Sequence, residues 1–511
     1  MYPGTWSEHT PDKPALIMAD TGQTLSYRAL EERSLRLANH LRALGLQPGD
    51  HIAMLAENRF ELVEAMWAAL RSGTLITAVN SHLTAQETAY IIRDCGARVL
   101  IVSAALPQAA EVMQLCADVP HHLAVGGPLA GSQDYEQALA AAPAERPNHE
   151  PRGGDMLYSS GTTGQPKGVL PELPQQGIED EAVPIVQLFK ALFGFDQDTV
   201  YLSPAPLYHA APLRFVMVTQ ALGGTAVIMP RFEPEDALRH IEQYRITHSQ
   251  WVPTMFIRML KLPEAVRGRH DLSSLKVAIH AAAPCPPDVK QAMIAWWGPV
   301  IHEYYAATEG NGLTAINSAE ALERPGSVGK ALLGIVHVCD PDGHELPPGE
   351  VGTIYFESRP EDRMFSYHRD PDKTERSRHP VHARWSTIGD LGWVDEDGYL
   401  YLADRSSNLI ISGGVNIYPQ EIENALALHP LVRDVAVVGE ADEELGQIVA
   451  AYIESTDSSL PTDALQAELE PWLSERMARF KIPRHFYRVS SLPRTPTGKL
   501  LKRKLDPALA Q

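Results

Sequence analysis

The sequence predicts an α/β protein of two domains, and three observations support this prediction. The chain has 511 residues, more than a single hydrophobic core usually serves. Strand-like apolar runs alternate with helical patterns along residues 24–296, which is typical of layered α/β subdomains with mostly parallel sheets. The pattern changes to short β-type runs over 326–403 and changes again after Arg405. We expect a large N-terminal domain over 1–405 that includes a small β-barrel, and a small, mobile α+β domain over 406–511.

The N-terminal third contains clear helix and strand patterns. A helix is predicted over 24–44, because leucines recur there at helical spacing. Ser26 can cap its first turn and Gly45 can end it. Further elements are expected as strands at 51–55 and 99–102, a helix at 61–71 and a surface connection at 130–154.

The middle and C-terminal regions continue these patterns. In the middle region, strands are expected at 225–229 and 277–281, and helices at 234–244 and 287–296. Asp342-Gly343 and Asp397-Gly398 mark tight turns between the short β-type runs of the expected barrel. After Arg405 the predicted elements are a turn at Gly413-Gly414, a helix over 419–428 that begins with Pro419, a strand at 435–438 and a helix at 464–477.

Charge and composition exclude several classes of protein. The formal net charge is −20, and an acidic surface opposes binding to nucleic acid and to anionic lipid. The first residues lack a basic stretch followed by an apolar run, and the apolar runs fall short of the ~18 residues of a membrane-spanning helix. The four cysteines form no CxxC pair, which favours reduced, buried thiols over a disulfide framework or a zinc site. We expect a cytoplasmic protein without an integral membrane segment.

One segment carries the clearest chemical pattern, Tyr158-Ser-Ser-Gly-Thr-Thr-Gly-Gln-Pro-Lys-Gly168. Its glycines, Gly161 and Gly164 among them, let backbone N–H groups turn toward phosphate oxygens. Lys167 adds a positive charge, and four side chains add hydroxyl donors, namely Ser159, Ser160, Thr162 and Thr163. An ordinary surface turn is the alternative, but the lysine and the apolar residues before the segment favour phosphate binding.

This segment is not a Walker A loop. That pattern requires Gly-x-x-x-x-Gly-Lys followed by Ser or Thr, whose hydroxyl binds magnesium. Counting from Gly161, the sixth position is Pro166, and Lys167 is followed by Gly168. The residues themselves therefore disfavour a P-loop ATPase or GTPase.

With this loop the sequence resembles the adenylate-forming acyl-CoA synthetases, which are related to luciferases and to the adenylation domains of peptide synthetases. The loop matches the signature Tyr/Phe-Ser/Thr-Ser-Gly-Ser/Thr-Thr-Gly-x-Pro-Lys-Gly of that family at every position. Ser26-Tyr27, Pro48-Gly-Asp50 and Phe480-Lys-Ile-Pro483 also stand in the family's order, so the resemblance covers nearly the whole chain. It implies that the loop residues 159–164 and Lys167 handle the β- and γ-phosphates of ATP.

A second match is Glu303-Tyr-Tyr-Ala-Ala-Thr-Glu309, which resembles the family's Tyr-Gly-x-Thr-Glu motif. The resemblance implies that Tyr305 lies against the adenine, that Tyr304 also binds the nucleotide and that Thr308 touches the α-phosphate. It also implies that Glu309 binds Mg²⁺, because a carboxylate beside a triphosphate requires such a cation.

Further matches lie around the expected domain junction. The resemblance implies Asp390 at the ribose, because a carboxylate can accept hydrogen bonds from both ribose hydroxyls, and Arg405 at the ribose or a phosphate. The hinge residue of relatives is a Lys or Asp; here it is Ser407, a small residue that can still absorb a change in φ and ψ. Gly413 and Gly414 would line the passage for the pantetheine arm of coenzyme A, where side chains would block it.

The last match is Pro493-Arg-Thr-Pro-Thr-Gly-Lys-Leu-Leu-Lys-Arg-Lys504, in which Lys499 corresponds to the family's catalytic lysine. A mobile ammonium group can bridge the carboxylate of the acid and the α-phosphate, and it neutralises charge that develops at phosphorus. We interpret Lys502, Arg503 and Lys504 as a basic C-terminal tail.

The acid-binding residues are implied by position. His209 stands where relatives have a residue that gates the acyl carboxylate, although a core or capping histidine is the alternative. Trp251 and Thr254 are expected beside the acyl pocket. Ala306 replaces the family's usual glycine, and its methyl group would narrow the pocket floor. Ala282 and Ala283 look like part of the adenine-side wall.

The segment Leu170-Pro-Glu-Leu-Pro-Gln-Gln-Gly177 departs from the basic, histidine-containing pattern that is usual after the loop. It resembles a subgroup that acts on bulky acids, including long-chain, alicyclic and steroid side-chain acids.

The resemblance implies an ATP- and Mg²⁺-dependent ligase that acts on a small-molecule carboxylic acid. It would form an acyl-adenylate with release of pyrophosphate and then a coenzyme A thioester with release of AMP. The alternatives are a stand-alone adenylation enzyme that loads a carrier protein in trans, a luciferase-like oxygenase and a catalytically silent nucleotide-binding regulator. The joint presence of Thr308, Glu309, Asp390, Arg405 and Lys499 argues against the silent regulator. No nucleic-acid partner is expected, and a homodimer stays open.

Overall fold

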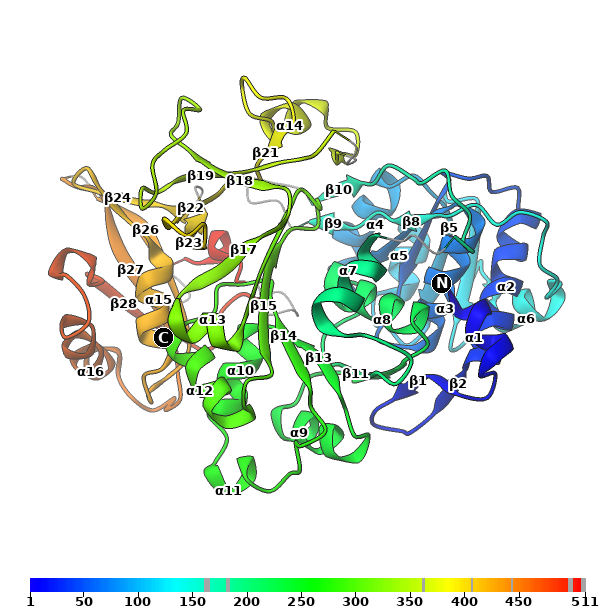
Figure 1. Ribbon diagram of the computed structural model, residues 1–511, viewed down its shortest axis with the longest axis horizontal. Coiled ribbons are helices and arrows are strands. Elements are labelled where there is room, and N and C mark those ends of the chain that lie inside the picture. Colours follow the sequence, from blue (N-terminus) through cyan, green and yellow to red (C-terminus); the bar gives the residue numbers. More distant parts are fainter. Residues whose placement is uncertain are drawn as a thin grey trace. The chain divides into compact units, whose positions relative to one another are not determined.

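The computed structural model describes residues 1–159, 166–180, 184–360, 364–405, 408–442, 444–494 and 500–506. The chain forms two compact units (Figure 1). Unit 1 consists of Met1–Gln250, Gly268–Ala278 and Arg363–Thr374, and unit 2 of Trp251–Arg267, Ile279–Asp362 and Glu375–Gln511. Helices and strands alternate along the chain, which confirms the predicted α/β class. The predicted domain boundary between residues 405 and 406 stays a prediction.

A six-stranded parallel sheet is the first layer of unit 1, in the order β7-β6-β5-β3-β4-β8. Its strands are β3 (His51–Leu55), β4 (Leu75–Val79), β5 (Ala97–Ser103), β6 (His121–Val125), β7 (Gln133–Asp134) and β8 (Gly154–Asp155). The helices between them are α3 (Phe60–Ser72), α4 (Ala85–Asp94) and α5 (Ala109–Leu115). These helices lie beside the sheet in Figure 1. The strands predicted at 51–55 and 99–102 are confirmed, since uninterrupted apolar runs suit parallel strands that are buried on both faces.

A second set of strands in unit 1 has the order β13-β11-β12-β1-β2. These are β1 (Pro14–Met18), β2 (Thr24–Ser26), β11 (Val200–Ser203), β12 (Thr225–Ile228) and β13 (His248–Trp251). The neighbouring helices in sequence are α1 (Pro3–His9), α2 (Tyr27–Ala43), α7 (Pro184–Phe193), α8 (Ala210–Ala221) and α9 (Pro234–Gln243). The helix predicted at 24–44 is present as α2 from Tyr27 to Ala43, whereas residues 24–26 form strand β2. The Ser26 hydroxyl oxygen accepts from the Ala29 N–H, and Gly45 has φ +82°. That positive φ is the conformation in which glycine ends helices.

The expected surface connection at 130–154 contains a helix that the sequence did not reveal. Helix α6 (Tyr135–Ala141) begins where the Asp134 carboxylate accepts from the Gln137 N–H at 2.9 Å. Tyr135 is buried and donates its hydroxyl to Glu64 at 2.9 Å. A helix of seven residues offers too few periodic positions for the sequence pattern to separate it from a loop.

A buried arginine ties this connection to two helices. Arg71 of α3 is 1% exposed, and its guanidinium donates to Glu31 of α2 at 2.7 Å and to Glu150 at 2.6 Å. Glu150 also accepts from Arg146 at 3.0 Å. Burial raises the pKa of Glu150, but hydrogen bonds and charges from Arg71 and Arg146 together lower it below its ordinary value. The negative charges of Glu31 and Glu150 are therefore fully compensated only while Arg71 is present.

Unit 2 contains a run of antiparallel strands in the order β18-β19-β22-β23-β17-β16-β15, with β21 (Trp385–Ser386) paired to β19. They are β15 (Ile301–Ala306), β16 (Leu313–Asn317), β17 (Ser327–Leu333), β18 (Ile335–Cys339), β19 (Gly352–Glu357), β22 (Asp390–Val394) and β23 (Leu400–Arg405). Val328, Ile354, Phe356 and Leu400 form their own core. Helices α10 (Pro253–Leu260), α11 (Glu264–Arg267), α12 (Pro287–Trp297) and α13 (Ser318–Glu323) accompany these strands in sequence.

Residues after 407 build a second sheet in unit 2, drawn in orange in Figure 1, with the order β25-β24-β27-β26 and β28 beside β27. Its elements are β24 (Ile410–Ser412), β25 (Val415–Ile417), α15 (Pro419–Ala427), β26 (Val432–Asp442), β27 (Gly446–Ser455), α16 (Thr462–Ser474), a 3₁₀ turn Arg479–Lys481, β28 (His485–Val489) and a 3₁₀ turn Lys502–Lys504. Leu465, Leu469 and Leu473 line one face of α16 and are fully buried in the core of this sheet. Pro419 begins α15, as predicted.

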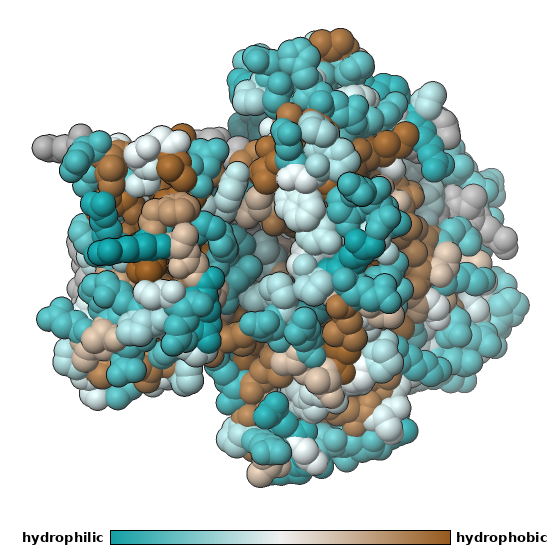
Figure 2. Space-filling view, turned by 60° about the vertical axis from the view of Figure 1, so that its left-hand side comes forward, coloured by the Kyte–Doolittle hydropathy of each residue, from teal (hydrophilic) through white to brown (hydrophobic). Residues whose placement is uncertain are grey.

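Remaining short elements are β9 (Tyr158–Ser159), β10 (Lys167–Leu170), β14 (Val277–His280), β20 (Ser366–Tyr367) and α14 (Pro371–Arg376). The face drawn in Figure 2 is mostly hydrophilic, with hydrophobic side chains in separate patches. Scattered apolar side chains of this kind are ordinary on proteins. Among the described residues, no helix is both long and apolar enough to cross a membrane.

Arg71→Met tests the buried ion cluster. The variant leaves Glu150 buried without its closest cation, so we expect the free energy of unfolding to fall by about 3 kcal/mol. The pKa of Glu150 is lowered in the folded protein, so its stabilising contribution exists above the ordinary pKa of a glutamate and is lost as the pH falls through the lowered value. The deficit of the variant should therefore shrink on acidification. Urea denaturation at neutral and acidic pH measures both effects.

Arg28→Met is the matched control, because Arg28 and its partner Asp12 are 64% and 87% exposed. This exposed pair should change stability by less than about 1 kcal/mol. Equal losses in the two variants would contradict the assignment of the cluster as a stabilising contact.

Candidate functional site

Three of the predicted site residues meet in unit 2, at the ends of strands β15, β22 and β23. The Tyr305 hydroxyl donates to Asp390 Oδ2 at 2.7 Å. Arg405 Nε lies 3.1 Å from Asp390 Oδ1. Asp390 and Arg405 are direct register partners on the antiparallel pair β22–β23. Both carboxylate oxygens are thus held by a donor, which fixes the orientation of the carboxylate plane.

The local sequence explains how Asp390 reaches this position. Gly389 has φ +84°, and its N–H donates to the Thr387 hydroxyl oxygen at 3.0 Å, so a tight turn leads directly into β22. Asp390 is only 7% exposed, and Arg405 offsets the cost of burying its charge. Burial and the Asp390 charge raise the pKa of Tyr305 well above its ordinary value. The Tyr305 hydroxyl therefore remains a hydrogen-bond donor over the physiological pH range.

The residues after Tyr305 form a turn beyond the end of β15. Ala306 is the last residue of the strand and pairs with Leu313 of β16. The turn closes with a hydrogen bond from the Gly310 N–H to the Ala307 carbonyl at 3.0 Å. Tyr304, Thr308 and Glu309 are half-buried. A carboxylate such as Glu309 offers the hard oxygen ligand that Mg²⁺ prefers, so the donor chemistry of this turn fits the expected metal.

Ala282 has a strained backbone conformation at the expected adenine-side wall. Its φ is +74°, in the left-handed region that disfavours residues with a Cβ. Ala282 and Ala283 are exposed and directly follow the buried end of β14. The strain at Ala282 marks this turn as a constrained feature of the fold.

Asp404 is a site-adjacent residue whose role the sequence pattern did not reveal. One carboxylate oxygen accepts from the Arg405 N–H at 2.6 Å and from Asn408 Nδ2 at 3.0 Å. The other accepts from the Gln420 N–H at 3.1 Å, in the first turn of α15. Asp404 therefore ties the end of β23 to the chain beyond Ser407.

Gly413 and Gly414 form the two-residue turn between β24 and β25. Their φ values are +56° and +80°, the combination of a tight hairpin turn. A Cβ on Gly413 would come within 3.3 Å of Leu445, whereas one on Gly414 would meet nothing within 4 Å. Backbone conformation alone thus accounts for both glycines, and the expected passage for pantetheine stays a prediction.

The phosphate loop joins two strands of a small sheet in unit 1, with the order β20-β10-β9. Lys167 pairs with Ser159, and Gly168 pairs with Tyr158. Lys167 Nζ lies 3.0 Å from Asp370 Oδ2, and this contact raises the pKa of Lys167. Ser160, Gly161, Thr162, Thr163 and Gly164 lie outside the described residues, as do the side chain of Ser159, the expected hinge Ser407 and the expected catalytic residue Lys499.

A groove of about 370 Å³ lies in the same unit as the loop. It is lined by Gln86, Tyr90, Arg93, Asp94 and Arg369. The Tyr90 hydroxyl donates to the carbonyl of Pro166 at 3.3 Å, so the groove adjoins the described end of the loop. The lining is of mixed charge, because Asp94 contributes a carboxylate beside the guanidinium groups of Arg93 and Arg369, and Arg93 Nε lies 3.7 Å from Asp118.

The residues expected beside the acid substrate are divided between the two units. His209 is half-buried at the N-cap position of α8 in unit 1, with its ring 4.5 Å from that of Tyr208. Trp251 is fully buried in unit 2, with ring centroids 6.2 Å from Phe256 and 5.5 Å from Trp297. Thr254 is half-buried in the first turn of α10. Trp251 is thus part of an aromatic core, and a role at the acid stays a prediction.

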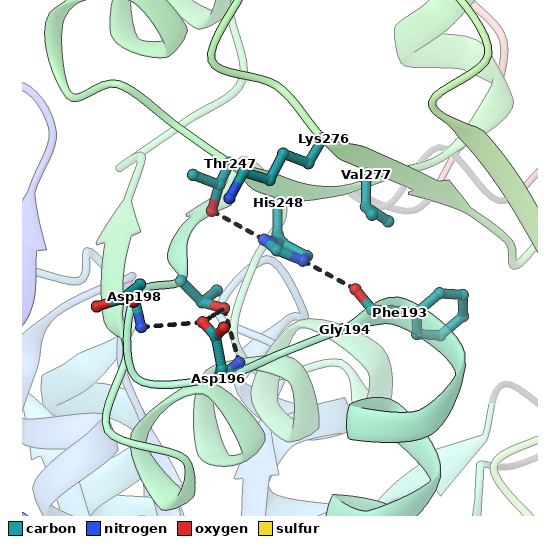
Figure 3. A pocket seen from close by; sticks show the side chains of 9 residues that line it. Phe193, Gly194, Asp196, Asp198, Thr247, His248, Lys276 and Val277 are labelled. Carbon is teal, nitrogen blue, oxygen red and sulfur yellow. Dashed lines mark hydrogen bonds between the residues drawn. The ribbon is translucent and has the colours of Figure 1, made fainter.

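A separate cavity of about 210 Å³ in unit 1 does not involve any predicted site residue (Figure 3). His248 lies at its wall between the Thr247 hydroxyl at 2.8 Å and the Phe193 carbonyl at 2.9 Å. Asp196 accepts from the Asp198 N–H at 2.9 Å, so its carboxylate stabilises its own turn. The dashed lines in Figure 3 join His248 to Thr247 and Phe193, and Asp196 to the backbone of Asp198.

One cluster among the described residues could hold a metal ion by composition, namely Asp340, Asp342 and His344. The Asp340 carboxylate accepts from the backbone N–H groups of Asp342 and His344 at 2.9 and 2.8 Å. A turn stabilised by an aspartate explains this arrangement.

Comparison with known proteins decides the family. The model of the AMP-binding enzyme family matches residues 5–360, and that of the AMP-binding enzyme C-terminal domain matches residues 421–499. The chain belongs to the AMP-binding enzyme family. The expected resemblance to adenylate-forming acyl-CoA synthetases is therefore confirmed, and so, at the level of the family, is an AMP-forming acid–thiol ligase.

The AMP-binding enzyme is similar over nearly its full length to characterised ligases. It is 31% identical to a fatty acid–[acyl-carrier-protein] ligase of Streptomyces coeruleorubidus, over 98% of this chain and 94% of that protein. It is 34% identical to a feruloyl-CoA synthase of Amycolatopsis sp, over 94% and 93%. The solved o-succinylbenzoate CoA synthetase of Bacillus subtilis, in complex with its acyl-adenylate intermediate, has a TM-score of 0.79 at 28% identity, over 99% of this chain and 97% of that one.

Tyr305→Phe tests the contact that orients Asp390. Loss of a hydrogen bond to a buried charged group should lower the free energy of unfolding by about 1.5–3 kcal/mol. Because folding raises the pKa of Tyr305, this contribution is complete below its ordinary value of 10.0 and is lost as the pH rises further. The difference between wild type and variant, measured by chemical denaturation, should therefore be constant near neutrality and shrink at high pH.

The control is Tyr401→Phe, because the Tyr401 hydroxyl lies 3.4 Å from Asp395 and makes a weaker hydrogen bond. A loss below about 1 kcal/mol is expected there. A larger loss in the control than in Tyr305→Phe would contradict the importance of the Tyr305–Asp390 contact.

Proposed function

We propose that this enzyme is an ATP-dependent acyl-CoA ligase that activates a carboxylic acid as its acyl-adenylate and transfers the acyl group to coenzyme A. The observation that carries this proposal is the contact of Tyr305 and Arg405 with the two oxygens of Asp390. These residues lie far apart in sequence and belong to separate family motifs, yet they converge on one buried carboxylate. A carboxylate held in one orientation is suited to accept hydrogen bonds from the two hydroxyls of a ribose.

In the first step, an oxygen of the acid's carboxylate attacks the α-phosphorus of ATP. The bond from the α-phosphorus to the bridging oxygen breaks, and pyrophosphate leaves with that electron pair. Asp390 and Arg405 would hold the ribose, and Tyr304 and Tyr305 the adenine. Thr308 would contact the α-phosphate, while Lys167 and the loop residues 159–164 would bind the β- and γ-phosphates.

Two cationic groups support this step in the proposal. Mg²⁺, when bound, neutralises phosphate charge, and Glu309 would hold it. Lys499 would bridge the attacking carboxylate and the α-phosphate, where negative charge develops. In the structure, Lys167 Nζ lies 3.0 Å from Asp370 Oδ2. Binding of a phosphate would therefore replace one anionic partner of Lys167 with another.

In the second step, the thiol of coenzyme A attacks the acyl carbon and AMP leaves, so that a thioester replaces the mixed anhydride. Lys499 would leave the site when the segment after Ser407 rotates. Exclusion of water protects the acyl-adenylate between the two steps.

For the acid, we propose a long-chain or bulky ring-bearing substrate, with alicyclic and steroid side-chain acids included. The unusual segment Leu170–Gly177 supports this choice. The names of the similar proteins include a fatty acid and a feruloyl group, so straight-chain and aromatic acids belong in any test. His209, Trp251, Thr254 and Ala306 remain the proposed determinants of the pocket, with Ala282 and Ala283 at the adenine side.

A second candidate function differs only in the molecule that accepts the acyl group. One similar protein is a ligase that uses an acyl-carrier protein, which favours a carrier protein in trans as the alternative to free coenzyme A. Both candidates share the adenylation step, so the acceptor is decided by whether product forms with coenzyme A alone.

Lys499→Ala should reduce adenylation at least about 100-fold, because a charge that stabilises the transition state is lost. Exchange of radiolabelled pyrophosphate into ATP, in the presence of the acid, measures this step alone. Lys504→Ala is the matched control, since Lys504 is an exposed lysine of the same segment and should leave exchange unchanged. Undiminished exchange in Lys499→Ala would remove Lys499 from the proposed mechanism.

A screen of fatty, aryl and steroid acids should yield AMP release that depends on coenzyme A as well as on the acid. The largest kcat/KM is expected for a long-chain or ring-bearing aliphatic acid. Release of AMP only after addition of a carrier protein would favour the second candidate. ATP binding without pyrophosphate release for any acid would instead indicate a silent nucleotide-binding protein.

A further inference from the structure

Two ion pairs flank the segment that carries Lys499. On one side, Arg494 Nη2 donates to Asp434 Oδ1 at 2.6 Å, and Arg494 Nε donates to the other carboxylate oxygen. On the other side, Lys502 Nζ lies 2.8 Å from Glu423 Oε1. Asp434 belongs to strand β26 and Glu423 to helix α15, so a strand and a helix of unit 2 hold the two sides.

The backbone also joins the two sides of this segment. Arg494 and Leu500 are bridge partners, and the Leu501 N–H donates to the Pro493 carbonyl at 2.8 Å. Residues 494 and 500 are therefore neighbours in space, and Lys499 is covalently bonded to Leu500. Residues 494 and 500 thus set where the chain that carries Lys499 begins and ends.

The pair between Glu423 and Lys502 is the more buried of the two. Glu423 is 8% exposed, and the Lys502 side chain is 16% exposed. Glu423 Oε1 also accepts from the Val437 N–H at 2.7 Å. A carboxylate in this position requires its cation, because removing one member of a buried ion pair leaves an uncompensated charge.

Apolar contacts anchor the same stretch. Leu500 and Leu505 pack against a small core formed by Ala436, Ala450, Tyr452, Val489 and Leu492. The interpretation of Lys502 as part of a basic tail is therefore wrong, since its ammonium group serves a buried carboxylate. Lys504, by contrast, is exposed, as a tail residue would be.

We propose that the Glu423–Lys502 pair, together with Arg494–Asp434, is a positioning device that sets the place of Lys499 for the adenylation step. This inference rests on the proposed function, in which Lys499 acts in adenylation and leaves before thioester formation. Lys502 and Glu423 touch neither substrate in this scheme and act only through the chain that bears Lys499. Their loss should consequently impair the first step and spare the second.

Lys502→Met tests the device, because it keeps the length of the side chain and removes its charge. Pyrophosphate exchange with the best acid of the screen reports the first step, and thioester formation from synthetic acyl-adenylate and coenzyme A reports the second. We expect exchange to fall by about 10-fold or more, and thioester formation to change by less than about twofold, because small displacements of a catalytic group are costly only in the step that uses it. Lys502→Arg should restore most of the exchange, and Lys504→Met should match wild type.

A double variant separates positioning from a general structural effect. With Lys499→Ala as background, Lys502→Met should cause no further loss of exchange, since the group to be positioned is already absent. Equal losses in both steps, or a further loss on the Lys499→Ala background, would overturn the inference. Unchanged exchange in Lys502→Met would overturn it as well.

A variant of the more exposed pair keeps the test decisive if Lys502→Met does not fold. Arg494 and Asp434 are each 24% exposed, so Arg494→Gln should be better tolerated and show the same selective loss. If Lys499→Ala itself retains full exchange, the proposed role of Lys499 fails. If Lys499→Ala loses exchange while Lys502→Met and Arg494→Gln do not, only the positioning device fails.

Discussion

The buried carboxylate of Asp390 is the contact on which the candidate nucleotide site depends. It accepts from Tyr305 on β15 and faces Arg405 on β23, while its own strand begins at the left-handed turn of Gly389. A carboxylate that is 7% exposed is stable only with such partners. The same requirement therefore fixes the relative positions of three strand ends, which is what a nucleotide site needs from its scaffold.

Asp404, the residue before Arg405, extends this set of contacts along the chain. Arg405 reaches back to Asp390, and the preceding residue, Asp404, reaches forward to Asn408 and to the first turn of α15. Two adjacent side chains thus connect the candidate nucleotide site with α15, the helix that carries Glu423. The described residues on the two sides of Lys499 are in turn paired with β26, through Arg494 and Asp434, and with α15, through Lys502 and Glu423.

Sequence motifs predicted much of this arrangement, because signatures and apolar periodicity are local properties. The strand at His51–Leu55 and the helix that starts at Pro419 follow from patterns within a few residues. The contact between Tyr305 and Asp390 spans 85 residues, and no local pattern encodes the strand register that creates it. The interpretation of Lys502 as a tail residue is wrong for the same reason. Its basic neighbours suggest a tail, whereas its partner Glu423 belongs to a helix that is distant in sequence. The loop residues 160–164, Ser407 and Lys499 stay predictions from the resemblance.

Asp404 also joins the chain on the two sides of the proposed hinge, Ser407. Its hydrogen bonds to Asn408 and Gln420 end on residues beyond position 407, while its backbone belongs to β23 before that position. A rotation about Ser407 would carry Asn408 and Gln420 away from the Asp404 carboxylate, so both hydrogen bonds would have to break or find new partners. Each is worth roughly 1.5–3 kcal/mol when the acceptor is charged. If Ser407 is the hinge, as proposed, its small side chain would impose little steric restriction. The resistance to rotation would then come from Asp404, which precedes it.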